Sequence, residues 1–377
     1  MLLILFIICV FMTYTNVYVK KKPLVSPRII VWAVFGVTSY IAFLNNNEWG
    51  DISILTFCVI LLELLVFSLG CGAAGVRNNV VAIGYERSSI YIPKMSTILI
   101  IAFLTVVTYI DYLEVARFSG GGAVGLLNIV AQARHNSYVD QTTIQHSFFV
   151  LQCLYFSKII AYVYIFIFLH AWIMRKEVVL LNLIPVGIYF VQSILSTGRT
   201  EFIYLSYTFV FMFYMLSRGN HTYRKKFRLV FLSTVGGFIF IFMLLGAVRS
   251  GGDGDMLKSL SEYAGCSIIA FNNIIEKNGI ESTSTFFGEQ TLPLLYSILR
   301  SVGLSNKATM DVMPFVYIGD TITNIFTAFG RYIHDYGILG MSLIVFLIGF
   351  WYEKLFNKLI SSQINGRNLV LYAFISY

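Results

Sequence analysis

Apolar residues in this sequence occur in long runs that are separated by shorter polar segments. A helix needs about 20 residues to cross the hydrocarbon core of a bilayer, and somewhat fewer with interfacial flanks. Runs of that kind predict membrane-spanning helices near residues 2–19, 29–44, 52–70, 95–113, 147–173, 178–196, 201–217, 229–248 and 337–353. A tenth run begins at Asn368 and reaches only Tyr377, which is too short to cross. We therefore expect about ten transmembrane helices, of which the last is truncated.

Two segments between these runs are too long to be simple turns, at about 114–147 and 249–336. Long connections in compact proteins usually carry function. In the second, apolar residues recur at the helical spacings of three and four: Leu257, Leu260, Ala264, Ile268, Phe271 and Ile275. Pro293 suits the first turn of a further helix with Leu294, Leu295, Ile298 and Leu299. The expected order is eight helices within 1–248, a large helical outer loop over 249–336, and C-terminal transmembrane segments over 337–377.

The composition excludes a soluble globular protein. Of the 377 residues, 57% are hydrophobic and 12% are charged, whereas soluble domains carry about 25% charged residues. The mean hydropathy is +0.76. The lipid bilayer is therefore the expected surroundings for much of the chain, and the predicted fold class is an all-α polytopic membrane protein.

The net charge of +8 would suggest a nucleic-acid partner in a soluble protein, but in a membrane protein the positions of the charges are more informative. No Lys or Arg precedes the first predicted span, and Lys20, Lys21 and Lys22 follow it. The positive-inside rule therefore places the N-terminus outside and this loop in the cytoplasm. Alternation of the later spans puts most of the other basic residues in cytoplasmic loops as well. No nucleic-acid partner is expected.

Charged residues within the predicted spans are few: Glu63, Lys158 and Asp111. Such residues are costly and usually functional, but a proton-coupled carrier would need more of them. The alternative is that Glu63 and Lys158 pair or extend toward the interface. Five scattered cysteines predict neither a disulfide framework nor a zinc site, and no nucleotide-binding or zinc-protease motif is present. No metal and no cofactor is expected.

Arginines on the predicted outer side are the more informative charges. Arg199 lies in a short turn between two spans, next to Glu201, and Arg249 ends another span on the same side. A planar guanidinium binds phosphate or diphosphate through two hydrogen bonds, which suits a lipid-phosphate ligand at headgroup depth. We take Arg199, Arg249 and Glu201 as candidate substrate-binding residues. The alternative for Arg199 is a simple anchor at the lipid headgroups.

A third cluster stands at the end of the second long segment. If residues 324–337 are helical, Arg331, His334 and Asp335 share one face, with Asp320 as the N-cap. A cation, an imidazole and a carboxylate together can bind an anion and transfer a proton, so these three are the candidate catalytic residues. The alternative is a local Arg331–Asp335 ion pair with His334 at the interface.

The first long segment adds Arg117, Arg134 and His135 near the glycine-rich stretch 120–125. Arg134 follows an apolar pattern that predicts an interfacial or re-entrant helix, formed by Leu126, Leu127, Ile129 and Val130. Such a helix would present Arg134 at membrane depth. We add Arg134 to the candidate binding residues.

Two short motifs resemble the O-antigen polymerase family, the repeat-unit polymerases of bacterial O-antigen and capsule synthesis. They are Ser196–Thr200, between two spans, and Asn324–Phe329 continuing through Asp335–Gly340. The family's organisation, with about ten to twelve spans and a large outer loop before the last ones, covers essentially the whole chain. The family often has Phe where Tyr336 stands, and its last spans are missing from this sequence.

The resemblance implies a GT-C-like fold that performs inverting, metal-independent glycosyl transfer on the outer face of the bacterial inner membrane. The donor would be a growing glycan on undecaprenyl diphosphate, and the acceptor would be a fresh repeat unit on the same lipid. Arg199 and Arg249 would hold the donor diphosphate, Arg331 would bind or orient it, His334 or Asp335 would act as the base, and Arg134 would hold the acceptor lipid. A chain-length regulator and a flippase of the same pathway are the further expected partners.

Three alternatives remain. An O-antigen ligase would share the arginines and the topology but transfer glycan to another acceptor. A lipid-linked oligosaccharide flippase or other transporter would need more charges within the spans. A non-enzymatic membrane scaffold would tolerate lysine in place of the outer arginines, whereas a bidentate diphosphate site would not.

Overall fold

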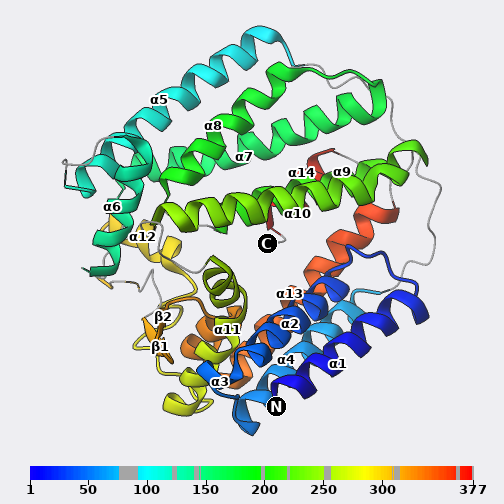
Figure 1. The fold of residues 1–377 in the computed structure, drawn as a ribbon, viewed down its shortest axis with the longest axis vertical. Coiled ribbons are helices and arrows are strands. Elements are labelled where there is room, and N and C mark those ends of the chain that lie inside the picture. The colour runs from blue at the N-terminus through cyan, green and yellow to red at the C-terminus, as the bar shows by residue number, and fades with distance from the viewer. Residues whose placement is uncertain are drawn as a thin grey trace. The chain divides into compact units, whose positions relative to one another are not determined.

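The computed structural model of the chain describes residues 1–75, 92–120, 125–139, 144, 146–196, 200–218, 221–249, 256–307, 309, 315–361 and 366–375. The regular structure within these ranges is almost entirely helical (Figure 1). The helices of the first part are α1 (Leu2–Tyr14) with its π-helical extension η1 (Thr15–Val19), α2 (Pro27–Leu44), α3 (Asn46–Trp49), α4 (Ile54–Ala73), α5 (Lys94–Phe118) and α6 (Leu126–Val139). They are followed by α7 (Phe148–His170) with the π-helical η2 (Ala171–Arg175), the 3₁₀ turn η3 (Leu180–Leu183), α8 (Ile184–Leu195), α9 (Thr200–Ser217) and α10 (His221–Arg249). The last elements are α11 (Met256–Asn278), α12 (Pro293–Ser301), the antiparallel strands β1 (Val316–Ile318) and β2 (Thr321–Thr323), α13 (Ala328–Ser361) and α14 (Gly366–Ile375).

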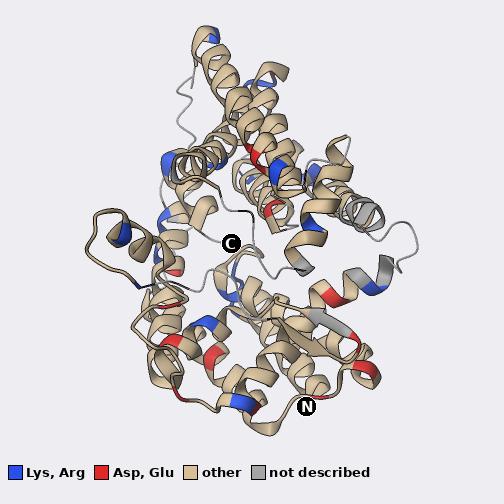
Figure 2. Cartoon of the chain, turned by 90° about the vertical axis from the view of Figure 1, so that its left-hand side faces the viewer, with Lys and Arg blue, Asp and Glu red and all other residues tan. Residues whose placement is uncertain are grey.

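Each apolar run of the sequence coincides with helical structure. In the described part of the chain, six helical stretches are long and apolar enough to cross a membrane: Leu2–Val19, Pro27–Leu44, Ile54–Ala73, Lys94–Phe118, Phe149–Arg175 and Ala328–Ile360. The stretch Leu180–Leu195 is apolar but shorter. Charged residues are sparse along the helices (Figure 2). The prediction of an all-α, multi-pass membrane protein is confirmed at this level, while ten spans, a GT-C-like fold and an outer loop stay predictions.

The chain forms two compact units, each of which combines segments that are distant in sequence. Unit 1 comprises Met1–Arg77 and Leu257–Asn357. Unit 2 comprises Asn78–Met256 and Lys358–Tyr377. In each unit an early part of the chain therefore packs with a much later part, which the chain order alone does not predict.

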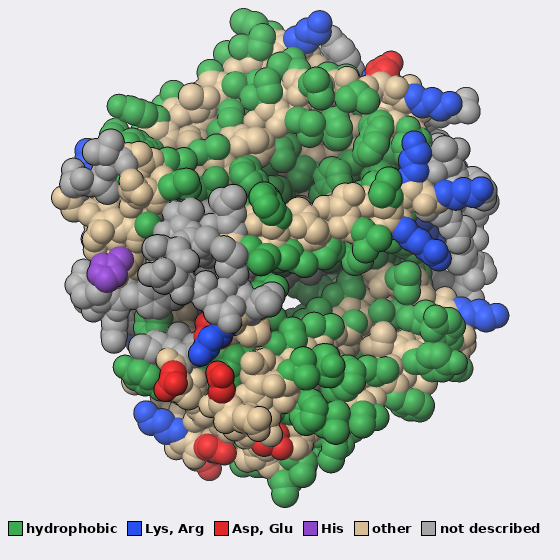
Figure 3. Space-filling view, in the orientation of Figure 1, with side chains coloured by type: hydrophobic (Ala, Val, Ile, Leu, Met, Phe, Trp, Pro, Cys, Tyr) green, Lys and Arg blue, Asp and Glu red, His purple; other side chains and the backbone are tan. Residues whose placement is uncertain are grey.

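In unit 1, α4 and α13 pack backbone against backbone. A Cβ atom at Gly70 would lie 2.1 Å from the carbonyl oxygen of Phe346, and one at Gly349 would lie 2.4 Å from that of Phe67. Small residues permit such close approach, which is the usual way that membrane helices associate in the absence of a hydrophobic driving force between them. Hydrophobic side chains cover the surfaces of α1, α2 and α4 (Figure 3).

The core of unit 1 joins its N-terminal helices to the later segments. Phe329 of α13 stacks on Phe35 of α2 at 5.2 Å between ring centroids and meets the edge of Phe271 of α11 at 6.2 Å. Gly265 of α11 fits against Trp49, whose ring would lie 2.8 Å from a Cβ at that position. The helix α11 therefore packs on the helices near the N-terminus.

The two ends of α13 differ in chemistry. Near its C-terminal end, the buried Glu353 accepts from Lys22, which follows the first span, at 2.6 Å. The opposite end begins at Ala328 and carries Arg331 in its first turn. The basic loop after the first span therefore lies at one end of α13 and the candidate catalytic cluster at the other.

Unit 2 is built around α7. The Tyr164 hydroxyl of α7 donates to Thr97 of α5 at 3.1 Å, while Gly366, at the start of α14, approaches the ring of Phe166. Tyr372 of α14 stacks on Phe211 of α9 at 4.9 Å. The C-terminal residues thus pack among the helices of unit 2.

The predicted helices of the second long segment are confirmed as α11 and α12, and Pro293 occupies the first turn of α12. Two details differ from expectation. The prediction of Asp320 as an N-cap is wrong, because Asp320 lies in the turn between β1 and β2 and the helix begins only at Ala328. Gly319, with φ 56°, makes this turn and packs against the carbonyl oxygen of Glu48, where no side chain would fit. The hairpin itself was not predicted.

Candidate functional site

The first turns of α13 bring together the three candidate catalytic residues. The helix is regular from Ala328 until Gly337, where φ 65° and ψ −174° interrupt it. A Cβ atom at Gly337 would lie 3.2 Å from the backbone nitrogen of Ser282. The N–H of Ile338 donates to the carbonyl oxygen of Ile280 at 2.9 Å. The break in α13 therefore lets the segment after α11 dock directly on its backbone.

The carboxylate of Asp335 is the centre of this cluster. It accepts from the backbone N–H of Gln290 at 3.0 and 3.2 Å, from the N–H of Thr291 at 2.8 Å and from the Thr291 hydroxyl at 2.7 Å. Its side chain is fully buried. Hydrogen bonds to an ionised acceptor are about twice as strong as neutral ones. Asp335 thus holds the segment before α12 in place.

His334 is adjacent to Asp335 and partly exposed. Its Nδ1 lies 3.0 Å from Oδ1 of Asp335, and 17% of its side chain is accessible. A carboxylate partner assigns the proton to Nδ1 and leaves a lone pair on Nε2. The His334 carbonyl oxygen accepts from the N–H groups of Thr283 and Ser284 at 3.0 and 3.1 Å. The ring is therefore oriented by a carboxylate, and the backbone that carries it is held by a docked segment.

Arg331 reaches the same short segment. Its Nη1 donates to the carbonyl oxygen of Gln290 at 3.4 Å. One face of the helix therefore carries Arg331, His334 and Asp335, as their spacing predicts. Arg331 and Asp335 bind the segment Gln290–Thr291, and His334 contacts Asp335. The Asp335 carboxylate is engaged with His334, Gln290 and Thr291, which accounts for its burial.

Glu201 belongs to a second polar cluster, in unit 2. Its carboxylate pairs with Lys158 of α7 at 3.0 Å and accepts from the hydroxyl of Tyr189 of α8. The ammonium of Lys158 also lies 4.6 Å from the ring centroid of Tyr204. Lys158 therefore has its counter-ion in Glu201.

Glu63, the other charge expected to pair within a span, lies in unit 1. Its carboxylate accepts from the Ser342 hydroxyl of α13. Glu63 and Lys158 therefore each have a partner other than one another. Neither partner can be identified from sequence spacing.

The remaining candidates are placed only in part. Arg199, with Thr197 and Gly198, lies outside the described residues, as does most of the glycine-rich stretch. Arg249 is the last residue of α10, and its side chain is outside what the structure describes. Arg134 is half-buried on α6, which confirms the predicted helix there. The binding roles of these arginines stay predictions.

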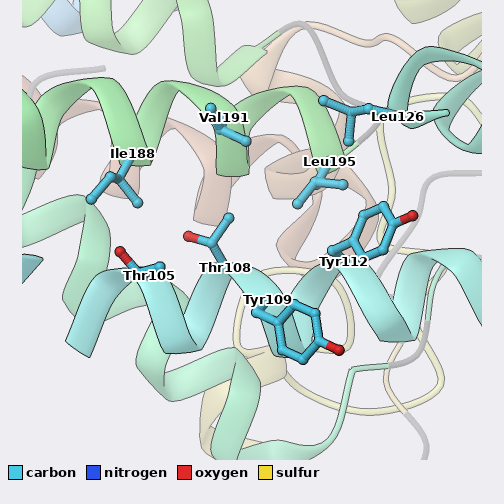
Figure 4. Close-up of a pocket in the computed structure, with 8 residues that line it drawn as sticks. All are labelled: Thr105, Thr108, Tyr109, Tyr112, Leu126, Ile188, Val191 and Leu195. Atoms are coloured by element: carbon cyan, nitrogen blue, oxygen red, sulfur yellow. The ribbon is translucent and has the colours of Figure 1, made fainter. Parts of the chain in front are cut away.

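Two features of unit 2 were missed by sequence reasoning. Nδ1 of His146 lies 2.8 Å from Glu114 and 3.8 Å from the buried Asp111, a cluster that the spacing of two carboxylates on α5 could have indicated. Between α5 and α8 there is a mostly apolar groove of about 320 Å³ (Figure 4). It is lined by Thr105, Thr108, Tyr109, Tyr112, Leu126, Ile188, Val191 and Leu195.

Comparison with known proteins shows a distant similarity. A protein named "O-antigen polymerase" from Shigella dysenteriae is 26% identical to this chain over 171 residues. The similarity covers 43% of this chain and 40% of the relative's length. No protein-family model matches the sequence, and no solved structure matches it. The similarity supports the resemblance carried by the two short motifs.

Proposed function

We propose that this chain polymerises oligosaccharide repeat units that are carried on undecaprenyl diphosphate, by glycosyl transfer at the outer face of a bacterial inner membrane. The name of the relative supports the reaction class. The observation that carries the proposal is the clustering of Arg331, His334 and Asp335 beside the segment Gln290–Thr291, at one end of a helix long enough to span a membrane.

The cluster supplies what an inverting transfer needs. His334 accepts the proton of the acceptor hydroxyl on Nε2, and the hydroxyl oxygen attacks the anomeric carbon of the donor glycan. The bond between that carbon and the diphosphate oxygen breaks, and its electron pair leaves with the diphosphate. Arginines stabilise the developing negative charge, so Arg331 binds or orients the diphosphate together with Arg199 and Arg249. No metal ion is required for this step.

Asp335 takes a supporting role in this proposal. Its carboxylate already has three donors from Gln290 and Thr291, and His334 provides a fourth. The carboxylate is occupied by these partners, and it fixes the tautomer and orientation of His334. Glu201, held by Lys158 and Tyr189, binds substrate together with Arg199, and Arg134 contacts the acceptor lipid.

The charges at the two ends of α13 support the proposed orientation. Lys22 and Glu353 pair at one end, next to Lys20 and Lys21, and the positive-inside rule assigns that end to the cytoplasm. Arg331 and His334 then lie at the outer end, where lipid-linked repeat units would meet the site. A flippase and a chain-length regulator would act with the enzyme.

The test is polymer length in a strain that lacks the gene and carries single variants. We expect only single repeat units with Arg331→Ala and with His334→Ala, and long polymer with Asp320→Asn in the exposed hairpin turn. Arg331→Lys should also fail, because a lysine cannot make two parallel hydrogen bonds to a phosphate. If Arg199→Ala and Arg331→Ala both leave long polymer unchanged, the site assignment is wrong.

The same strains separate the rival functions. Loss of a ligase would keep long lipid-linked polymer and abolish its attachment to the final acceptor. Loss of a flippase would leave repeat units on the inner face of the membrane. A scaffold would tolerate Arg331→Lys. With purified protein, lengthening of lipid-linked repeat units in the presence of EDTA, with inverted anomeric configuration, would support the proposed reaction.

A further inference from the structure

The helix α12 turns an apolar face away from unit 1. Leu294, Leu295 and Ile298 are 56%, 47% and 45% exposed, and the helix has no buried residue. These positions fall on one side of a helix, at spacings of one, three and four. An exposed contiguous apolar surface marks an interaction site.

Contacts on the other side of α12 fix this orientation. The Tyr296 hydroxyl donates to the carbonyl oxygen of Phe287 at 2.6 Å, and the Tyr296 ring meets the edge of Phe286 at 4.9 Å. The side with Tyr296 therefore faces the segment Phe286–Phe287, whose Phe287 ring lies 4.9 Å from the ring of Tyr336 in α13, and the leucine side is exposed. Exposed apolar residues adjoining the helix extend the surface: Phe287, Val302 and Leu304.

The position of α12 along the membrane normal follows from α13. Gly337 interrupts the candidate span Ala328–Ile360, and the uninterrupted helix that follows it is about 35 Å long against a hydrocarbon core of about 30 Å. Its ends therefore reach the headgroup regions. Asp335, near one end, binds Thr291, and α12 begins at Pro293, two residues after Thr291. The apolar face is thus tethered at the depth of the membrane interface.

The charges around the face match an anionic lipid surface. From Thr291 to Lys307 the sequence has two basic residues, Arg300 and Lys307, and no acidic one. Both are exposed, and Lys307 lies 4.8 Å from the ring centroid of Phe286. A helix with an apolar face and flanking cations binds in the plane of a membrane interface.

We infer that α12 is an in-plane membrane helix whose partner is the lipid bilayer. The face defined by Leu294, Leu295, Ile298, Val302 and Leu304 inserts between lipids at the boundary of headgroups and acyl chains. Arg300 and Lys307 contact lipid phosphate groups. This surface belongs to the long segment between the spans and is separate from the predicted catalytic residues.

A fluorescent label tests the insertion in the full-length protein reconstituted into vesicles of phosphatidylcholine and phosphatidylglycerol. Leu295→Cys carries an environment-sensitive label on the apolar face, and Ser297→Cys carries it about 200° around the helix. Asp320→Cys, in the exposed hairpin turn, is the reference for water. The unsubstituted protein gives the background from its own cysteines.

We expect blue-shifted emission at position 295 that nitroxide groups on lipid acyl chains quench at least twofold more than at position 320, with the reverse order for aqueous iodide. Position 297 should be quenched less by lipid nitroxide than position 295. Quenching of position 295 by iodide alone would show a water-exposed face and overturn the inference. Quenching by neither agent would mean that another part of the chain, a second copy or another protein covers the face, and would overturn it equally.

The charge contribution has its own test in the Leu295→Cys background. Replacing Arg300 and Lys307 with glutamate should remove the difference in emission between anionic vesicles and vesicles of phosphatidylcholine alone. A difference that persists in this variant would overturn the assignment of these residues to lipid phosphate. Lys277→Glu, in α11, is the matched change of charge and should leave the difference in place.

Discussion

The Thr291 hydroxyl donates to Oδ2 of Asp335 at 2.7 Å, joining residues 44 positions apart. The backbone N–H of Thr291 donates to the same oxygen at 2.8 Å. Through these two bonds, one buried carboxylate connects the start of the long helix α13 to the segment that leads into α12. The same carboxylate orients His334, so the packing of the segment and the geometry of the proposed base depend on one side chain.

Asp335→Asn should therefore affect stability as well as activity. The amide keeps the size of the carboxylate but removes its charge and presents an NH₂ group to some of the donors. Hydrogen bonds to a charged group contribute about 1.5–3 kcal/mol each, so we expect a loss of about 3 kcal/mol in the free energy of unfolding in detergent. Polymer should be lost in cells.

His334→Ala is the matched comparison for this prediction. His334 provides only one of the four hydrogen bonds to Asp335, so its removal should lower the free energy of unfolding by about 1.5 kcal/mol, less than Asp335→Asn does, while polymer is also lost. An Asp335→Asn protein with unchanged stability would contradict the supporting role. An active His334→Ala protein would remove His334 as the base.

Gly70→Ala should separate α4 from α13. The new Cβ would lie 2.1 Å from the Phe346 carbonyl oxygen, which is backbone and cannot move aside alone. Overpacking costs about 1–3 kcal/mol, so the thermal unfolding midpoint should fall. Gly72→Ala, on the same helix, would place its Cβ 3.4 Å from the Arg28 guanidinium and should have little effect. Equal midpoints for the two variants would show that the close contact does not limit the packing.

The helices were predictable from the sequence because membrane solvation imposes a local rule. A span must be apolar over most of its length to lie in lipid, so the run at 2–19 and the run at 52–70 are each visible without knowledge of their neighbours. The division into two units was not predictable in this way. It depends on contacts such as Gly70 with Phe346, which lie far apart in sequence.

The candidate site was also predictable from the sequence only where its geometry is local. Helical spacing predicts that Arg331, His334 and Asp335 share a face, because that geometry is local. It does not identify Gln290 and Thr291, whose backbone N–H groups hold Asp335, since nearly every residue has such a group. The error at Asp320 has a related cause. A carboxylate near the start of a helix resembles an N-cap, but the pairing of β1 with β2 places Asp320 in a hairpin turn, where Gly319 packs on Glu48.

Cys266 should make stability depend on pH in the alkaline range. It is fully buried in α11, and burial, with a smaller contribution from the charge of Glu262, raises the pKa of its thiol from 9.0 to about 12. The unfolded chain then loses this proton before the folded protein does. Stability from this group is complete below pH 9 and declines between pH 9 and about 12.

The measurement is the free energy of unfolding from about pH 7.5 to about pH 10.5, on either side of the ordinary thiol pKa, for the native sequence and for Cys266→Ala. The free energy of unfolding of the native sequence minus that of Cys266→Ala should decline above pH 9, with a limiting slope of about 1.4 kcal/mol per pH unit. Native protein should also resist maleimide at this position until it is unfolded. A difference that stays constant over the whole range, or rapid labelling of the folded protein, would contradict the burial of the thiol.

The ion pair between Lys158 and Glu201 should show strong energetic coupling. Lys158 is buried and its ammonium lies 3.0 Å from the Glu201 carboxylate. Removal of one partner leaves a charge in a poorly solvated position, which costs about 3 kcal/mol. Lys158→Met and Glu201→Gln should each destabilise unit 2, whereas the double variant should cost less than their sum. Arg175 and Glu177, 3.6 Å apart and more exposed, form the control pair and should show almost no coupling.

Additive effects at Lys158 and Glu201 would mean that the pair does not hold α7 and α9 together.

Polymer length in the same variants then separates two roles of Glu201. If its carboxylate acts only through Lys158 and Tyr189, polymer should return in the double variant as stability returns, since the glutamine that replaces Glu201 can still accept from the Tyr189 hydroxyl. If the carboxylate also contacts substrate, as its position two residues after Arg199 suggests, the double variant should be stable and still make only short chains.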